Sequence, residues 1–185
     1  MMKNAITPTT RVILYLTTAD QLVKLFIRLF FFESRFNILS DVLTFFPVVN
    51  TKYSWVAHYL PFLESRFFAV AINVVIGYFI YRIYKDYTKQ HGNGDKTVDL
   101  IFVLAMAGTL CSFTDKLFGG SIDFLYLKGF FIFDIKDVYI VVAQGILLVK
   151  YLVPLARNKV KEQVAATSEA EEPPEGDTES DNKEN

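Results

Sequence analysis

Long apolar stretches, separated by short polar segments, dominate this sequence. Four of them approach the roughly 20 residues that a helix needs to cross a hydrocarbon core about 30 Å thick. They cover residues 12–32, 67–84, 98–118 and 138–155. Nearly all charged residues lie between these stretches or after the last of them. The pattern therefore predicts an all-α integral membrane protein, built as a bundle of four transmembrane helices.

The connection between the first two predicted spans, residues 33–66, has a different pattern. It is rich in β-branched and aromatic residues and is interrupted by Pro47 and Pro61. Such a composition is typical of short strands, and Trp and Tyr side chains are favoured at the level of the lipid headgroups. We therefore expect a small β-rich element outside the membrane in this loop.

Lysine and arginine are distributed unevenly between the two sides of the predicted bundle. They are more frequent before the first span, in residues 85–96 and after the fourth span. Because positively charged flanks tend to stay in the cytoplasm, we expect both termini there and the β-rich element on the opposite side. Residues 85–96 are polar and contain Gly92 and Gly94, which predicts a short loop with a turn. The first apolar stretch contains charges and has no clear cleavage site, so we expect it to remain as a helix rather than be removed as a signal peptide.

Charge divides the chain into a basic body and an acidic tail. From Glu169 to Asn185 there are eight acidic residues and one lysine, which leaves 12 acids against 18 bases in the remainder. The basic residues of the body flank apolar spans, so anionic lipid headgroups are favoured over nucleic acid as their partners. The tail has too little apolar surface to fold alone. We expect a membrane domain over residues 1–161 and a disordered cytoplasmic tail over residues 162–185.

Few residues are available for cofactor chemistry. Cys111 is the only cysteine, and the only histidines are His58 and His91. These numbers exclude an intramolecular disulfide and a thiolate metal cluster and argue against a zinc site. Cys111 lies in the middle of a predicted span, where we expect it to act as a small packing residue. We therefore expect neither a metal nor an organic cofactor.

Charged residues inside the first predicted span need an explanation, since each costs at least about 2.5 kcal/mol in a membrane. Asp20, Lys24 and Arg28 follow one another at intervals of four, which places them on one face of a helix. Asp20 and Lys24 can form an ion pair that lowers the cost of burial. Such a pair either fixes helix packing or supports a nearby reaction centre, and the sequence leaves both interpretations open.

Aspartates gather around the outer ends of the third and fourth spans. Asp115 closes the third span, Asp123 falls in the predicted loop that follows, and Asp134 and Asp137 precede the fourth span. Two neighbouring carboxyl groups that share one proton can activate a water molecule, one as a base and the other as an acid. Acids at a membrane boundary can equally be solvated groups without a catalytic role. The pattern alone does not decide between these interpretations.

Five short segments, in chain order, add a resemblance. They are Asp20-Gln21-Leu22-Val23-Lys24, Asn50 within VVNTKYSW, GTLCSFTDK with Gly108, Asp115 and Lys116, SIDF with Asp123, and Phe133-Asp134-Ile135-Lys136-Asp137. Together they resemble motifs of the lipoprotein signal peptidase (signal peptidase II) family, which read D-Q-x-x-K, N-x-G, G-x-x-x-N-x-x-D-R, V-x-D-F and F-N-x-A-D. The resemblance extends over most of residues 12–155.

The resemblance implies a four-helix aspartyl peptidase with Asp123 and Asp137 as its catalytic pair. It also implies removal of the signal peptide from diacylglyceryl-modified prolipoproteins. The enzyme would be a monomer in the bacterial cytoplasmic membrane, with both termini cytoplasmic and its active site extracytoplasmic. Further residues would support the fold or the substrate pocket: Asp20, Lys24, Asn50, Ser112, Asp115, Lys116 and Asp134.

The chain departs from the family motifs at Lys52, Ser112, Lys116, Asp134 and Lys136. An extra acid near the catalytic pair favours bound protons, whereas a nearby lysine disfavours them. The departures motivate an alternative function, a non-catalytic relative that binds lipidated peptides or a membrane partner. A small channel or transporter is a third alternative, in which the charged face of the first helix would line a path.

Overall fold

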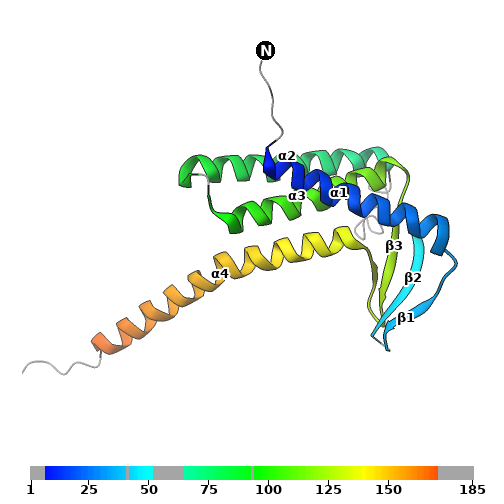
Figure 1. Ribbon diagram of the computed structural model, residues 1–185. Helices are drawn as coiled ribbons and strands as arrows, with labels where there is room; N and C mark the ends of the chain where they lie inside the picture. Colours follow the sequence, from blue (N-terminus) through cyan, green and yellow to red (C-terminus); the bar gives the residue numbers. More distant parts are fainter. Residues whose placement is uncertain (1–6, 41, 52–64, 93, 171–185) are drawn as a thin grey trace, which may run out of the picture. The chain divides into compact units, whose positions relative to one another are not determined.

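The computed structural model describes residues 7–40, 42–51, 65–92 and 94–170. The chain divides into two compact units, residues 1–147 and 148–185. Its helices are α1 (Pro8–Phe26), which continues as a π-helical turn η1 (Ile27–Phe31), α2 (Arg66–His91), α3 (Lys96–Leu117) and α4 (Ile135–Ala170), drawn in Figure 1. Its strands are β1 (Phe36–Leu39), β2 (Leu43–Asn50), β3 (Ser121–Leu127) and β4 (Ile132–Phe133). The protein is therefore mostly helical, with one small sheet.

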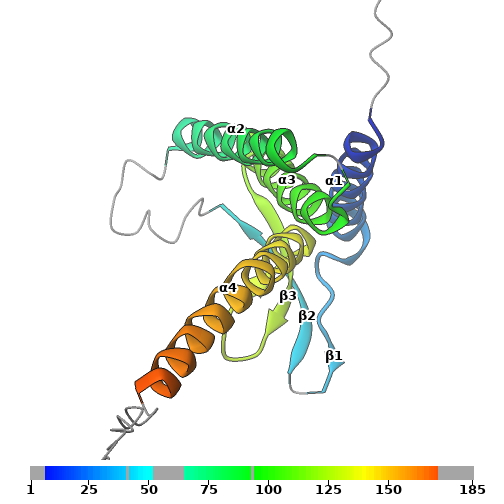
Figure 2. The same ribbon diagram turned by 90° about the vertical axis from the view of Figure 1, so that its left-hand side faces the viewer.

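Helix α3 packs against both α1 and α2, and Figure 2 shows it between them. Ile13 of α1 and Val103 and Ala107 of α3 form a buried apolar cluster, with Tyr139 of α4 against it. Many apolar side chains on the outer faces of these helices are nevertheless exposed, and Ala69 and Asn73 are the only buried residues of α2. Such surfaces are stable when lipid covers them.

Three of the helices are long and apolar enough to cross a membrane. They are Arg66–His91, Lys96–Leu117 and the part of α4 that covers Ile135–Lys161. These three helices agree with the second, third and fourth predicted spans. Helix α1 is not among them, because Arg11, Asp20 and Lys24 interrupt its apolar sequence. The first predicted span therefore stays a prediction.

The polar loop predicted over residues 85–96 is mostly helical. Helix α2 continues to His91 and ends at Gly92, whose positive φ of 78° suits glycine. Residues 85–91 include neither glycine nor proline, so nothing in the local sequence ends the helix earlier. Two tyrosines near the end of α2 donate hydrogen bonds to the following helix and its cap: Tyr84 to Asp99 at 2.7 Å and Tyr87 to Asp95 at 3.0 Å.

Helix α4 is longer than the predicted span. It begins at Ile135 and runs to Ala170, with Pro154 inside it. The first part of the predicted tail is therefore helical, and residues 171–185 lie outside the described part of the chain.

The strands form one antiparallel sheet in the order β1-β2-β3-β4. Strands β1 and β2 confirm that the loop after the first helix contains short strands. By contrast, β3 occupies a segment that was predicted as a loop. The register between β2 and β3 shifts between Phe45 and Val48, where the fully buried Pro47 stands. A proline suits such an irregularity because it has no N–H to donate to the ladder.

The sheet is joined to the helices at the point where α3 ends. Gly119 and Gly120 connect α3 to β3, both with positive φ. A Cβ on Gly120 would lie 3.0 Å from the carbonyl oxygen of Asn50, so only glycine permits this approach without a shift of the neighbouring backbone. Phe45, Ile122 and Phe124 of the sheet pack against Ile27 of η1. These contacts hold β3 beside the C-terminal end of the first helix, at η1.

Candidate active site

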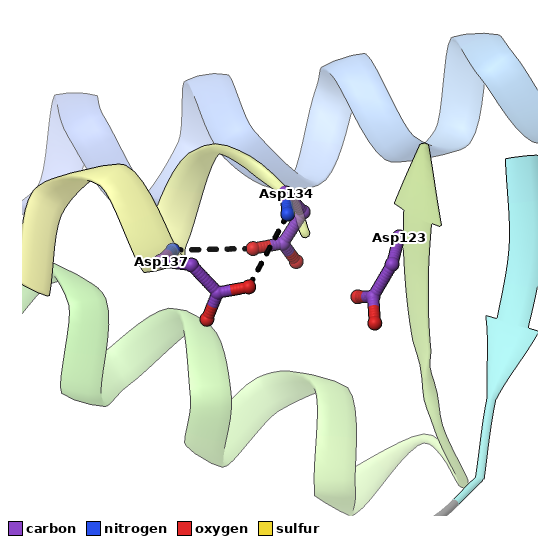
Figure 3. A group of neighbouring side chains, drawn as sticks. All are labelled: Asp123, Asp134 and Asp137. Atoms are coloured by element: carbon purple, nitrogen blue, oxygen red, sulfur yellow. Dashed lines mark hydrogen bonds between the residues drawn. The ribbon is translucent and has the colours of Figure 1, made fainter. Parts of the chain in front are cut away.

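Three carboxylates meet between β3 and the beginning of α4. Figure 3 shows Asp123 on β3 facing Asp134 and Asp137, which come from the N-terminal end of α4. One carboxylate oxygen from each lies within 4.8 Å of the others. Asp123 and Asp134 are buried, whereas the Asp137 side chain is 40% exposed. The cluster therefore has a closed side and an accessible side.

Asp134 and Asp137 are held by the start of the helix itself. Asp134 precedes the first residue of α4, and its Oδ1 accepts a hydrogen bond of 3.2 Å from the amide of Asp137. In return, Asp137 Oδ2 accepts a 3.2 Å bond from the amide of Asp134. This reciprocal arrangement is a capping box with aspartate at both positions. It fixes the two carboxylates relative to each other.

Asp123 is oriented by the neighbouring strand. Asn50, at the end of β2, donates a 2.7 Å hydrogen bond from Nδ2 to Asp123 Oδ2. The other oxygen, Oδ1, is buried and accepts no hydrogen bond from the described residues. A buried carboxylate oxygen left in this way is costly unless a proton or a bound group satisfies it. Asp123 thus has one oxygen bonded to Asn50 and one, Oδ1, that lies 3.6 Å from the Lys136 ammonium.

Lys24 of α1 reaches into the same region. Its ammonium lies 2.7 Å from Asp20, 2.8 Å from Asp115 of α3 and 2.8 Å from Asp134. The predicted Asp20–Lys24 pair is therefore confirmed, and it belongs to a larger buried network. Gln21 also donates to Asp115, at 3.0 Å.

Arg28, which was predicted on the same face of α1, behaves differently. Its side chain is exposed, and the neighbouring Ile27 is buried at the start of the π-helical turn. The predicted charged face therefore ends at Lys24. Its two buried members, Asp20 and Lys24, belong to the carboxylate network.

Lys136 is the site residue that sequence reasoning missed, since it was noted only as a departure from a motif. Its ammonium pairs with Asp134 and lies within 4.0 Å of further acids: Asp115 at 3.4 Å, Asp123 at 3.6 Å and Asp137 at 3.9 Å. A lysine in the first turn of a helix opposes the helix dipole. That unfavourable position was the available signal that Lys136 has a specific electrostatic partner.

The two lysines control the charge of Asp134. Burial alone would raise the pKa of the Asp134 carboxyl, but Lys136 and Lys24 hold this pKa below its ordinary value. The hydroxyl of Ser121 also donates to Asp134, at 2.9 Å. Asp134 is therefore an ionised, fully bonded group and acts as an acceptor only.

The predicted residues Ser112 and Lys116 line a different feature. Lys116 donates a 3.0 Å hydrogen bond to Ser112, and both border a cavity of about 510 Å³. The cavity is lined by α2, α3 and residues 140–147 of α4, mainly with alanine, isoleucine and leucine side chains. Its few polar groups include Asn73 and Gln144. Lys52, the remaining departure, lies outside the described residues.

Comparisons with known proteins agree with this arrangement. Residues 12–153 match the sequence profile of a family described as "Signal peptidase (SPase) II". Two solved structures, both described as a bacterial membrane enzyme studied by the in meso method, have a similar fold. The first has a TM-score of 0.63 and 17% identity over 80% of this chain and 90% of that one. The second has a TM-score of 0.61 and 17% identity over 78% and 92%. A comparison with curated proteins found no match.

Proposed function

The chain belongs to the signal peptidase II family, and on this basis we propose that it is a membrane aspartyl endopeptidase that cleaves prolipoproteins. The observation that carries the proposal is the proximity of Asp123 and Asp137, whose carboxylate oxygens approach within 4.8 Å. Such a pair suits peptide hydrolysis without a metal or an organic cofactor. The proposed substrate is a diacylglyceryl-modified prolipoprotein, cut just before its lipidated cysteine.

In the proposed reaction, Asp123 and Asp137 hold one water molecule and share one proton. The ionised carboxylate takes a proton from the water as it attacks the scissile carbonyl carbon, and the protonated carboxyl donates to the carbonyl oxygen. Collapse of the tetrahedral intermediate breaks the C–N bond, and a proton passes to the leaving amine. Asn50 keeps Asp123 in place, and the accessible Asp137 is the acid closer to an incoming substrate.

The cavity between α2, α3 and α4 supports a substrate with a long apolar segment. Its walls are mostly aliphatic, which matches a hydrophobic signal peptide, and Lys116 and Ser112 supply polar groups. Within this proposal the cavity takes part of the substrate's apolar segment.

The proposed placement in the membrane has α1 as a fourth span, with both termini in the cytoplasm. The charges that interrupt α1 support this, because Asp20 and Lys24 are buried in ion pairs rather than exposed to lipid. The sheet and the carboxylate cluster would then lie on the extracytoplasmic side of a bacterial cytoplasmic membrane. That side is where a translocated substrate presents its cleavage site.

A second candidate is a non-catalytic relative that binds lipidated peptides. The position of Lys136 favours it, because an ammonium lies 3.6 Å from Asp123 and 3.9 Å from Asp137, and a positive charge there opposes a proton shared between them. Without a shared proton, the pair would lack its general acid. This candidate predicts binding of the prolipoprotein without turnover.

A cleavage assay in lipid nanodiscs tests the proposal. Purified protein would be incubated with a diacylglyceryl-modified prolipoprotein, and Asp123→Asn and Asp137→Asn would be compared with wild type. Asp86→Asn is a matched control, because Asp86 lies on an exposed part of α2. We expect both cluster variants to lose at least about 100-fold in rate, the lower range for general acid–base catalysis, and the control to retain it. Full activity in both cluster variants excludes this pair as the catalytic group.

A further inference from the structure

Lys136 occupies a central position in the carboxylate cluster. Its side chain is 11% exposed, and its ammonium contacts groups from α3, β3 and α4. These groups are Asp115, Ser121, Asp123, Asp134 and Asp137. Three of them, Asp123, Asp134 and Asp137, come from β3 and the start of α4, and the lysine ammonium lies within 4.0 Å of each.

The backbone places Lys136 there through a close contact between α3 and α4. A Cβ on Gly108 of α3 would lie 2.6 Å from Ile140 and 3.2 Å from the carbonyl oxygen of Lys136. Glycine at position 108 therefore lets the first turn of α4 approach α3 closely. This approach brings a lysine that opposes the helix dipole into a buried site, which requires strong compensation.

The compensation comes from Asp134. It forms the closest ion pair of Lys136 and is itself fully buried. Asp134 and Lys136 carry one negative and one positive charge, so the pair adds no net charge beside Asp123 and Asp137.

We propose that Lys136 is a positioning residue of the carboxylate pair, and that Asp134 and Lys136 act as one unit. Asp134 fixes the ammonium beside Asp123 and Asp137, and the ammonium sets how readily these two acids hold their shared proton. The inference rests on the proposed function, in which this pair performs the hydrolysis.

Other charged groups near Lys136 also contribute to the electrostatic potential at the carboxylate pair. Lys24 and Asp20 extend from α1, and Asp115 and Lys116 from α3. Asp115 lies 3.4 Å from Lys136 and also pairs with Lys24, so it is shared between the two lysines. These residues stay constant in the test below.

A double-mutant cycle with Asp134→Asn, Lys136→Ala and the double variant tests the inference. Asparagine is as good an N-cap as aspartate, so Asp134→Asn keeps the start of α4. Lys89→Ala is the matched control, since Lys89 lies on an exposed part of α2. The readouts are kcat, KM and the pH dependence of cleavage in nanodiscs, together with the thermal unfolding temperature.

Each single variant should lower kcat about tenfold or more, whereas the double variant should recover most of that loss, as expected for strongly coupled neighbours. KM should change less than kcat. Loss of the positive charge in Lys136→Ala should move the pH–rate profile to higher pH, because the shared proton is then held more tightly. Loss of the negative charge in Asp134→Asn should move it to lower pH, and the double variant should return toward wild type.

Additive losses with an unchanged pH profile, in an active wild type, overturn the inference and leave the proposed function intact. If a single variant fails to fold, the activity of the double variant tests the inference instead. A folded double variant with kcat within about tenfold of wild type supports the inference that Asp134 and Lys136 act as one unit. A double variant that folds but is inactive contradicts it. If wild type cleaves nothing, the proposed function fails and this inference fails with it.

Discussion

Asp134 and Asp137 cap each other at the start of α4, because the amide of each donates a 3.2 Å hydrogen bond to the carboxylate of the other. The acid that we propose to react is therefore part of the helix terminus. One oxygen of Asp137 is committed to the cap, and the other, Oδ1, remains for chemistry at 3.9 Å from Lys136. In this proposal, catalysis and helix capping depend on the one side chain of Asp137, and substitutions can separate the two.

The two roles of Asp137 predict different results for two substitutions. Asp137→Asn keeps an oxygen that can accept from the Asp134 amide, so stability should stay close to wild type while cleavage is lost. Asp137→Ala removes the cap as well and should destabilise the protein by about 1 kcal/mol more. Thermal unfolding of both variants measures this difference. Equal unfolding temperatures would show that the cap contributes nothing.

The Asn50–Asp123 hydrogen bond predicts a kinetic defect in Asn50→Ala. A hydrogen bond to a charged group contributes about 1.5–3 kcal/mol, so kcat/KM should fall about 10- to 100-fold. Asn37→Ala on β1 is the control, since the Asn37 side chain accepts an exposed hydrogen bond from the Thr44 hydroxyl. Steady-state cleavage kinetics of both variants give the comparison. An unaffected Asn50→Ala would remove Asn50 from the positioning of Asp123.

The network around Lys24 predicts a large effect on stability. Lys24→Met leaves Asp20, Asp115 and Asp134 without a cation that contacts all three. Loss of one partner of a buried ion pair costs about 3–5 kcal/mol. Arg82→Met should cost at most about 1 kcal/mol, because Arg82 and Asp86 form an exposed pair 3.5 Å apart. Chemical unfolding in detergent compares the two, and similar losses would contradict the importance of the buried network.

The lowered pKa of Asp134 predicts how stability depends on pH. Since Lys136 and Lys24 hold the folded-state pKa below the ordinary value of about 3.9, the unfolded state binds a proton first as the pH falls. The stabilising contribution is therefore complete above about pH 5 and is lost progressively at lower pH. Asp134→Asn should show a weaker loss of unfolding temperature between about pH 5 and pH 3. An identical acid dependence in the variant and wild type would contradict this electrostatic role.

The helices could be predicted from the sequence because long apolar stretches specify them directly. The ends of the helices were less predictable. Helix α2 continues through polar residues as far as Gly92, because those residues are also compatible with a helix. Strand β3 was missed because its pairing with β2 joins residues far apart in the chain, such as Asp123 and Val48. A short segment gives little local indication of such a partner.

Part of the candidate site was also predictable. The spacing of Asp20 and Lys24 indicated their pair, and the sequence showed four aspartates gathered around two span ends, of which only the family resemblance singled out Asp123 and Asp137. The role of Lys136 depends on the close contact of Gly108 with α4 and on the capped first turn, which are properties of the folded chain. Sequence spacing alone therefore showed a departure from a motif and not its consequence.

Mass spectrometry of a diacylglyceryl-modified prolipoprotein after incubation with the wild-type protein in nanodiscs tests the central claim most directly. The account predicts two products, a released signal peptide and a lipoprotein that begins with the lipidated cysteine. Asp123→Asn, which keeps the size of the side chain, should leave the substrate intact. An uncleaved substrate with folded wild-type protein would contradict the peptidase proposal, and binding without cleavage would favour the non-catalytic relative.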